Sequence, residues 1–247
     1  VFAGFFVLDN IQAIRGRRDR DAAADLRPAA AALGAGDTAT TLALAAGVLR
    51  SARDVRARAM ALELTAWAHL GDDDPAAAVT ALAALPPDVA PSGHLRALLT
   101  EADPAERVNA TVDAWLVHRY VPAGIYAPRL AAAGLEDVVA ERLLASRAES
   151  APAARLAFQH TLFVGGRYDA SARLGERIVA AGERHPTVAY NVACAKARSG
   201  DRDGAIAWLG NAIDLGFTDI GLLDGDPDLA PVRSDPRFAM VRNRVPT

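Results

Sequence analysis

The feature that most constrains this chain is a turn signal that recurs along almost its whole length. A glycine or an aspartate that opens a turn appears six times, at steps of 31 to 35 residues. The turns are Gly36-Asp37, Gly71-Asp72, Asp103-Pro104, Gly134-Leu135, Gly166-Arg167 and Gly200-Asp201. A period of this length is typical of arrays of two-helix units, in which neighbouring units bury one continuous core.

The stretches between these turns are rich in alanine, leucine and arginine, which favour helix. Apolar residues in them recur at steps of three and four, as Val188, Val192 and Ala195 do. Alternating runs of β-branched and aromatic residues, which indicate strands, are nearly absent from the sequence. The sequence therefore predicts an all-α fold.

The last complete unit shows how its two helices end, begin and cross. Gly200 can adopt the left-handed conformation that ends a helix, and Asp201 can accept hydrogen bonds from the free amides of the next one. Ala193, Ala205 and Ala212 are small enough to let two antiparallel helices approach closely. We therefore expect alanines at the helix crossings.

The segment from Tyr190 to Gly216 resembles a tetratricopeptide repeat. Its small residue in the first helix is Ala193, its turn is Gly200-Asp201, and its second helix has alanines at positions 205 and 212. The resemblance implies a right-handed α-solenoid of about six antiparallel helix pairs over residues 21–217. The match is poor at about residues 90–150, where Pro122 and Pro128 would interrupt a long helix.

Residues 218–247 resemble the terminal element that closes bacterial arrays of this kind. Asp226 and Asp235 each precede a proline, which places an N-capping acceptor before the residue best suited to the first helical position. We expect Leu229, Val232 and Phe238 to cover the apolar end of the last repeat, because a solenoid needs such a cap.

The first 20 residues allow two interpretations. The run from Val1 to Leu8 is apolar, and arginines follow it between Arg15 and Arg20. One interpretation is the end of a transmembrane helix, with membrane attachment through residues upstream of Val1 and the arginines on the cytoplasmic side. The other is a soluble helix that packs on the first repeat. A secretory signal is disfavoured, because its positive charges precede the apolar core, whereas here the arginines follow it.

The composition excludes several classes of function. Lys196 is the one lysine among 27 basic residues, and its surroundings do not match a P-loop, a Schiff-base enzyme or a protein kinase. The net charge is −3, and only one short basic stretch occurs, which argues against nucleic-acid binding. The sequence contains no HExxH, GxSxG or CxxC motif.

The metal-ligating and nucleophilic residues form no constellation either. The five histidines are widely spread, and the C-terminal aspartates lack the ligand order of an EF-hand and suit helix capping. The single cysteine, Cys194, is predicted to be a packing residue. The sequence therefore predicts no metal, no cofactor and no enzymatic activity.

In tetratricopeptide repeats, the inner face of each first helix lines a groove for an extended peptide or a partner helix. By the repeat register that the resemblance implies, the groove-lining residues of this chain are Arg58, Thr65, His69, His160, Phe163, Tyr190, Asn191 and Arg198. Asn191 has two interpretations, because its amide could bond to a bound peptide or within the array. The lysines of the family's carboxylate clamp are absent, which disfavours recognition of chaperone tails.

The expected function is therefore that of a non-catalytic cytoplasmic scaffold that binds a protein or peptide partner in its groove. An alternative rests on the apolar start. In that alternative the chain is the cytoplasmic C-terminal region of a bacterial inner-membrane protein, such as an intramembrane metalloprotease of the site-2 type, whose catalytic part lies upstream of Val1.

Overall fold

The computed structural model describes residues 17–99, 103–117 and 121–245, with side chains from residue 26 onward. Within these residues the structure has 14 α-helices and one 3-10 helix, and it has no strand there. The chain divides into two compact units, Val1–Ala133 (unit 1) and Gly134–Thr247 (unit 2). The predicted all-α fold is confirmed. The apolar start lies outside the described residues, so its two interpretations stay predictions.

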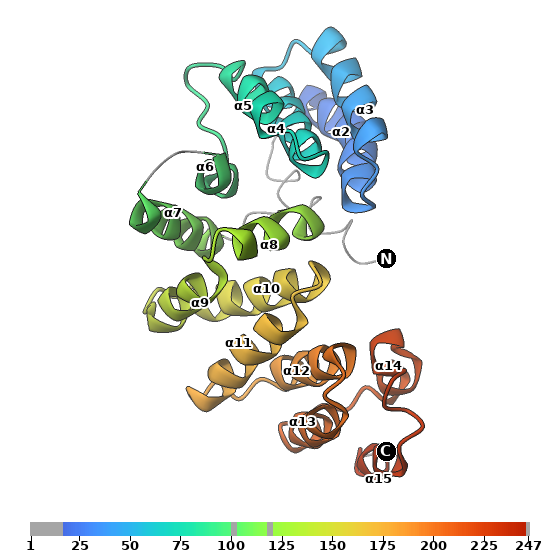
Figure 1. The fold of residues 1–247 in the computed structure, drawn as a ribbon. Coiled ribbons are helices and arrows are strands. Elements are labelled where there is room, and N and C mark those ends of the chain that lie inside the picture. The colour runs from blue at the N-terminus through green and yellow to red at the C-terminus, as the bar shows by residue number, and fades with distance from the viewer. Residues whose placement is uncertain (1–16, 100–102, 118–120, 246–247) are drawn as a thin grey trace. The chain divides into compact units, whose positions relative to one another are not determined.

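The helices of the two units are shown in Figure 1. Unit 1 contains α2 (Arg17–Gly34), α3 (Thr38–Ser51), α4 (Val55–Gly71), α5 (Pro75–Ala83), α6 (Gly93–Leu99), α7 (Pro104–Leu116) and α8 (Ala123–Ala132). Unit 2 contains α9 (Glu136–Ala145), α10 (Ala151–Val164), α11 (Tyr168–Ala180), α12 (Pro186–Ser199), α13 (Arg202–Asp214), α14 (Ile220–Gly225), η1 (Pro227–Leu229) and α15 (Pro236–Arg242).

Consecutive helices pack in pairs within each unit. In unit 1, α2 packs on α3, α4 on α5 and α6 on α7, and α4 also contacts α2 and α3. In unit 2, α10 packs on α11 and α12 on α13, and α11 contacts both α12 and α9. A helix that contacts both its own partner and the next pair is the arrangement of a helical-repeat array.

In five turns between helices a left-handed residue lies two positions before the first residue of the next helix. Glycine occupies that position at Gly36, Gly134, Gly166 and Gly200, with φ between 68° and 93°. At the end of α4 the position belongs to Asp73, with φ of 62°, the one non-glycine residue with positive φ among those described. The expected turn at Gly71-Asp72 is shifted towards the C-terminus, to Asp72 and Asp73, because α4 continues through position 71.

Aspartates cap many of the helices, as the sequence predicts. Asp37, Asp74 and Asp201 each accept a hydrogen bond from the backbone N–H three residues later, at 2.9 Å. Asp226 and Asp235 accept from the N–H two residues later, also at 2.9 Å. Each bond satisfies an amide that the helix itself leaves without a partner, and the negative charge suits the helix N-terminus.

Small residues let the helices of unit 2 approach closely. Ala193, Ala205 and Ala212 are all fully buried in the cluster that α12 and α13 share, as we expect of alanines at a helix crossing. Gly175 in α11 marks the tightest approach. A Cβ atom there would lie 2.1 Å from Nε2 of Gln159 and 2.3 Å from Cγ2 of Val192, so no larger residue fits.

The core of unit 1 instead contains a group of large rings. Tyr126 from α8 makes edge-to-face contacts with Trp67, His94 and Trp115, at centroid distances of 5.1 to 6.2 Å. All four rings are buried. In this region Pro122 precedes α8 as its N-cap, but α8 continues past Pro128, so the expectation that this proline interrupts the helix is wrong.

No described helix combines the length and the apolar character that are needed to cross a membrane.

Candidate functional site

The clearest side-chain site in unit 2 lies on one stripe of α12. Tyr190, Cys194 and Arg198 are four residues apart, so they lie one above the other on the same helix face. The C-terminal segment contacts all three. The Tyr190 hydroxyl donates to Asp226 Oδ2 at 2.7 Å, and Sγ of Cys194 lies 3.8 Å from the same oxygen.

Arg198 ends this stripe and joins three elements. Its Nη1 donates to Asp228 Oδ1 at 2.5 Å, and its Nη2 donates to the Tyr168 hydroxyl at 2.6 Å. The guanidinium also lies over the Tyr168 ring, 4.9 Å from the centroid. The hydrogen bond to Asp228 is the main cause that raises the pKa of Arg198. The α12 face therefore already binds two carboxylates, both from the chain's own C-terminal segment.

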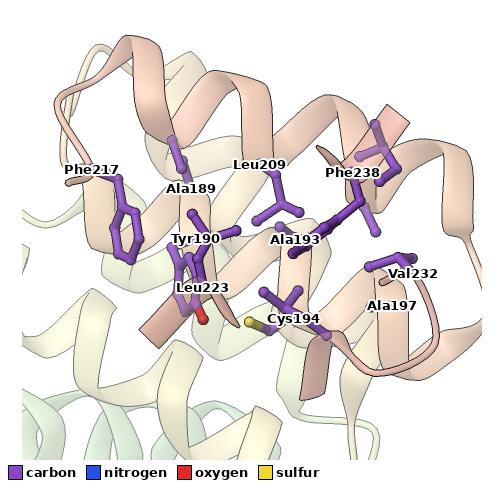
Figure 2. Close-up of a cluster of buried hydrophobic side chains, with 14 of the residues drawn as sticks. Ala189, Tyr190, Ala193, Cys194, Ala197, Leu209, Phe217, Leu223, Val232 and Phe238 are labelled. Atoms are coloured by element: carbon purple, nitrogen blue, oxygen red, sulfur yellow. The ribbon is translucent and has the colours of Figure 1, made fainter. Parts of the chain in front are cut away.

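Apolar contacts hold this segment in place. Figure 2 shows Leu223, Val232 and Phe238 among the side chains of α12 and α13. Leu223, Leu229 and Val232 are fully buried, and Phe238 is 5% exposed. Tyr190 stacks on Phe217 with a centroid distance of 4.4 Å. The predicted covering of the apolar end by residues 229, 232 and 238 is therefore what the structure shows.

The environment of Cys194 keeps its thiol unreactive. Burial, together with the carboxylate of Asp226, raises its pKa well above the ordinary value. Burial also raises the pKa of the Tyr190 phenol, and the neighbouring Cys194 and Asp226 add to the shift. Both groups are protonated at neutral pH, so Cys194 lacks the thiolate that a nucleophile needs.

The stripe on α10 corresponds to that on α12, but the C-terminal segment does not cover it. The turns at Gly166 and Gly200 are 34 residues apart, so Leu156, His160 and Val164 correspond to Tyr190, Cys194 and Arg198. His160 is exposed, Val164 is 50% exposed and Leu156 is half-buried.

The two stripes are connected by an aromatic contact. Phe163, one residue before Val164, packs edge-to-face on Tyr168 at 5.3 Å, and Tyr168 in turn accepts from Arg198. Phe163 is only partly buried and packs against the apolar cluster of α12. It therefore lies between the covered stripe and the exposed one.

Asn191 lies beside the stripe and takes part in packing. Its Nδ2 donates to Gln159 Oε1 at 3.5 Å, and the buried Gln159 donates to the carbonyl of Val188 at 3.4 Å. Of the two interpretations of Asn191, the structure contains the internal hydrogen bond. Its part in peptide binding stays a prediction.

The three predicted residues of unit 1 lie on α4. Arg58 donates to the carbonyl of Leu49 at 2.6 Å, which satisfies an acceptor near the end of α3. Thr65 donates to the carbonyl of Ala61 within the same helix, and His69 is half-buried in the last turn. These residues are in a different unit from His160, Phe163, Tyr190, Asn191 and Arg198.

Sequence reasoning missed the partners of the α12 stripe. The sequence predicts that Asp226 and Asp228 cap helices, and Asp226 does cap η1 through its Oδ1 while its Oδ2 accepts from the Tyr190 hydroxyl. The signal was present in two aspartates two residues apart, opposite a tyrosine and an arginine eight residues apart. Nothing in the sequence alone brought these two pairs together.

The described residues contain no group of three or more His, Cys, Asp or Glu side chains arranged to hold a metal ion. A comparison with models of protein families and one with curated proteins both found no match for this chain.

Proposed function

We propose that this chain is a helical-repeat scaffold of the tetratricopeptide type that binds a peptide segment of a partner protein on the α10 face of unit 2. The observation that carries the proposal is the occupancy of the neighbouring stripe. On α12 the stripe binds a segment of the same chain, Asp226–Leu229, through a phenol and a guanidinium. On α10 the corresponding stripe is exposed.

The repeat spacing supports the family assignment. Left-handed glycines at Gly166 and Gly182 recur at Gly200 and Gly216, so both the turn inside the helix pair and the turn after it repeat at 34 residues. This is the length of one tetratricopeptide unit.

The chemistry of the α10 face indicates the kind of peptide. Leu156, Phe163 and Val164 offer apolar surface, and the His160 imidazole adds a donor or acceptor between them. A segment with apolar side chains at alternate positions would bury this surface, and its main chain would bond to the polar groups. No residue of the proposed face is arranged for covalent chemistry, so the proposed role is binding.

The test is selection of peptides from a random displayed library on the full chain, followed by affinity measurement on the variant Val164→Asp. Burial of a charge beside apolar residues should weaken binding of the selected peptides at least about tenfold. Val138→Asp is the matched control, because Val138 is 45% exposed on the neighbouring helix α9.

Unchanged affinity for Val138→Asp with a loss for Val164→Asp would support the proposal. Failure to select any peptide, or an equal loss in both variants, would overturn it. Circular dichroism of each variant checks that the helices are intact.

A further inference from the structure

A small cavity in unit 1 lies far in sequence from the α10 face. Its volume is about 290 Å³, and its apolar walls come from the ends of α4, α6 and α8 and from the start of α5. These walls are formed by Leu70, Pro75, Leu98, Leu99, Ala132 and Ala133. Pro75 and Ala132 are exposed, so the cavity reaches the surface of the unit. A volume of this size suits a ligand smaller than most drugs.

Two arginines complete the lining, and they differ in what they bind. Arg107 of α7 is half-buried, and its Nε donates to the carbonyl of Ala97 at 2.9 Å. This bond fixes the plane of the guanidinium, and within the described residues Arg107 has no carboxylate partner. A half-buried guanidinium that no described carboxylate contacts favours the approach of an anion.

Arg129 of α8 is held in place by α4 and its turn. Its Nη2 donates to the carbonyl of Leu70 and, at 2.9 Å, to Asp73 Oδ1. Its side chain is 28% exposed, whereas that of Asp73 is 89% exposed. The pair therefore orients Arg129 at the cavity and neutralises its charge.

Asp73, which binds Arg129, differs from the residues at the equivalent position of the other turns. The equivalent position before the second helix is glycine at Gly36, Gly134, Gly166 and Gly200, whereas Asp73 adopts φ of 62°. A left-handed conformation is less favourable for aspartate than for glycine. Residues other than glycine in this conformation are uncommon and are found more often at functional sites. Here the carboxylate positions a cavity-lining arginine.

From this geometry we propose that the cavity binds a small apolar monocarboxylate. The carboxylate would pair with the terminal nitrogens of Arg107, and the apolar body would lie against Leu98 and Leu99. Among the described residues, Asp73 pairs with Arg129 and the charge of Arg107 is left, so this charge balance favours a monoanion. A free acid and the C-terminal residue of a peptide share this chemistry. The site is independent of the proposed peptide face in unit 2.

The test uses calorimetric titration of the full chain with N-acetyl-L-leucine and with its neutral amide. We expect saturable binding of the acid, at least about tenfold tighter than binding of the amide, because the amide cannot form the ion pair. A glycine-serine pentapeptide that ends in leucine, with a free or an amidated terminus, distinguishes a peptide end from a free acid as the source. Both carry the proposed group, so binding of either supports the site.

Three variants locate the site. Arg107→Met keeps the aliphatic stem and should weaken binding of the acid about tenfold or more. Arg56→Met removes an exposed arginine of α4 that does not line the cavity and should leave binding unchanged. Asp73→Gly restores the glycine of the other turns, so the fold is kept, while the uncompensated charge of Arg129 should tighten binding of the acid about threefold.

No saturation by about 20 mM acid would overturn the proposal, because such a site would bind more weakly than about 1 mM. Equal binding of acid and amide, or an equal loss in Arg56→Met and Arg107→Met, would also overturn it. Thermal unfolding of each variant, measured in parallel, separates loss of the site from loss of the fold.

Discussion

In unit 2 the α10–α11 and α12–α13 pairs have the same spacing, whereas the helix pairs of unit 1 are spaced less regularly. In unit 2, Gly166 and Gly182 recur 34 residues later at Gly200 and Gly216. In unit 1, the left-handed positions Gly36 and Asp73 are 37 residues apart, and α5 and α6 are joined by nine residues, 84–92. The two units therefore differ in how regularly their helix pairs follow one another, and different side chains fill the space between the helices.

Where the repeat is regular, small residues set the distance between helices. The α11–α12 crossing depends on Gly175, and the α12–α13 contact on fully buried alanines. Where the repeat is irregular, the space is filled by the rings of Trp67, His94, Trp115 and Tyr126. The helices of unit 2 therefore approach closely at small residues, whereas large aromatic rings fill the wider space between the helices of unit 1.

The largest effect should come from the rings of unit 1. Tyr126 is fully buried and contacts Trp67, His94 and Trp115, so Tyr126→Ala removes the centre of the group. We expect a loss of about 4 kcal/mol in the free energy of unfolding, as for other buried aromatic residues. Urea unfolding followed by tryptophan fluorescence, with Trp208→Phe to silence unit 2, measures it.

Tyr126→Phe is the matched control for this prediction, because it keeps the ring and should cost far less. If Tyr126→Ala shifted the unfolding midpoint no more than Tyr126→Phe, the aromatic group would not be the core of unit 1. The contrast between the two units would then lose its basis.

A somewhat smaller effect is expected at the end of unit 2. Leu223 of α14 is fully buried in the cluster with α12 and α13, and Leu223→Ala should cost about 3 kcal/mol. Leu222 is adjacent and 44% exposed, so Leu222→Ala should be nearly neutral. Fluorescence of Trp208, which packs against the same cluster, reports the transition. Equal effects of the two substitutions would show that the C-terminal segment is not a packed cap.

The turn spacing and the apolar faces are enough to predict the helix pairs α10–α11 and α12–α13 of unit 2, because there the turn glycines recur at one spacing. The C-terminal cap is also predictable from the sequence, because its Asp-Pro helix starts and its apolar residues, such as Leu229, lie within one short segment. The rest depends on contacts over long sequence distances. The pairing of Arg198 with Asp228, and of Tyr126 with Trp67, joins residues 30 or more positions apart, and no period encodes them. The left-handed Asp73 was missed because Gly71 is the residue that ordinarily ends such a helix.

Glycine in the two units should respond to substitution with opposite sign. Gly175→Ala places a Cβ into Gln159 and Val192 and should destabilise unit 2 by about 2 kcal/mol. Gly47 lies in α3 with nothing closer than 4.0 Å, so Gly47→Ala should stabilise unit 1 by about 0.5 kcal/mol through helix propensity. Thermal unfolding of the two variants tests both. Stabilisation by Gly175→Ala would contradict the close crossing that we assign to unit 2.

The smallest effect compares one capping aspartate from each unit. Asp235 caps α15, and its hydrogen bond from the side chain of Arg237, followed by that from the backbone N–H, lowers its pKa from 3.8 to about 2. Asp37 caps α3, and hydrogen bonds from Thr40 lower its pKa without any arginine. Because the folded pKa lies below the unfolded one, each cap stabilises its unit fully above about pH 4. The contribution of Asp235 is then lost as the pH falls through about 2.

Carboxyl titration by NMR measures both pKa values. In 1 M salt the Asp235 pKa should rise toward 3.8 and the Asp37 pKa should change less, because screening weakens an exposed ion pair more than a cap hydrogen bond. Equal salt sensitivity would show that Arg237 does not determine the difference between the two caps.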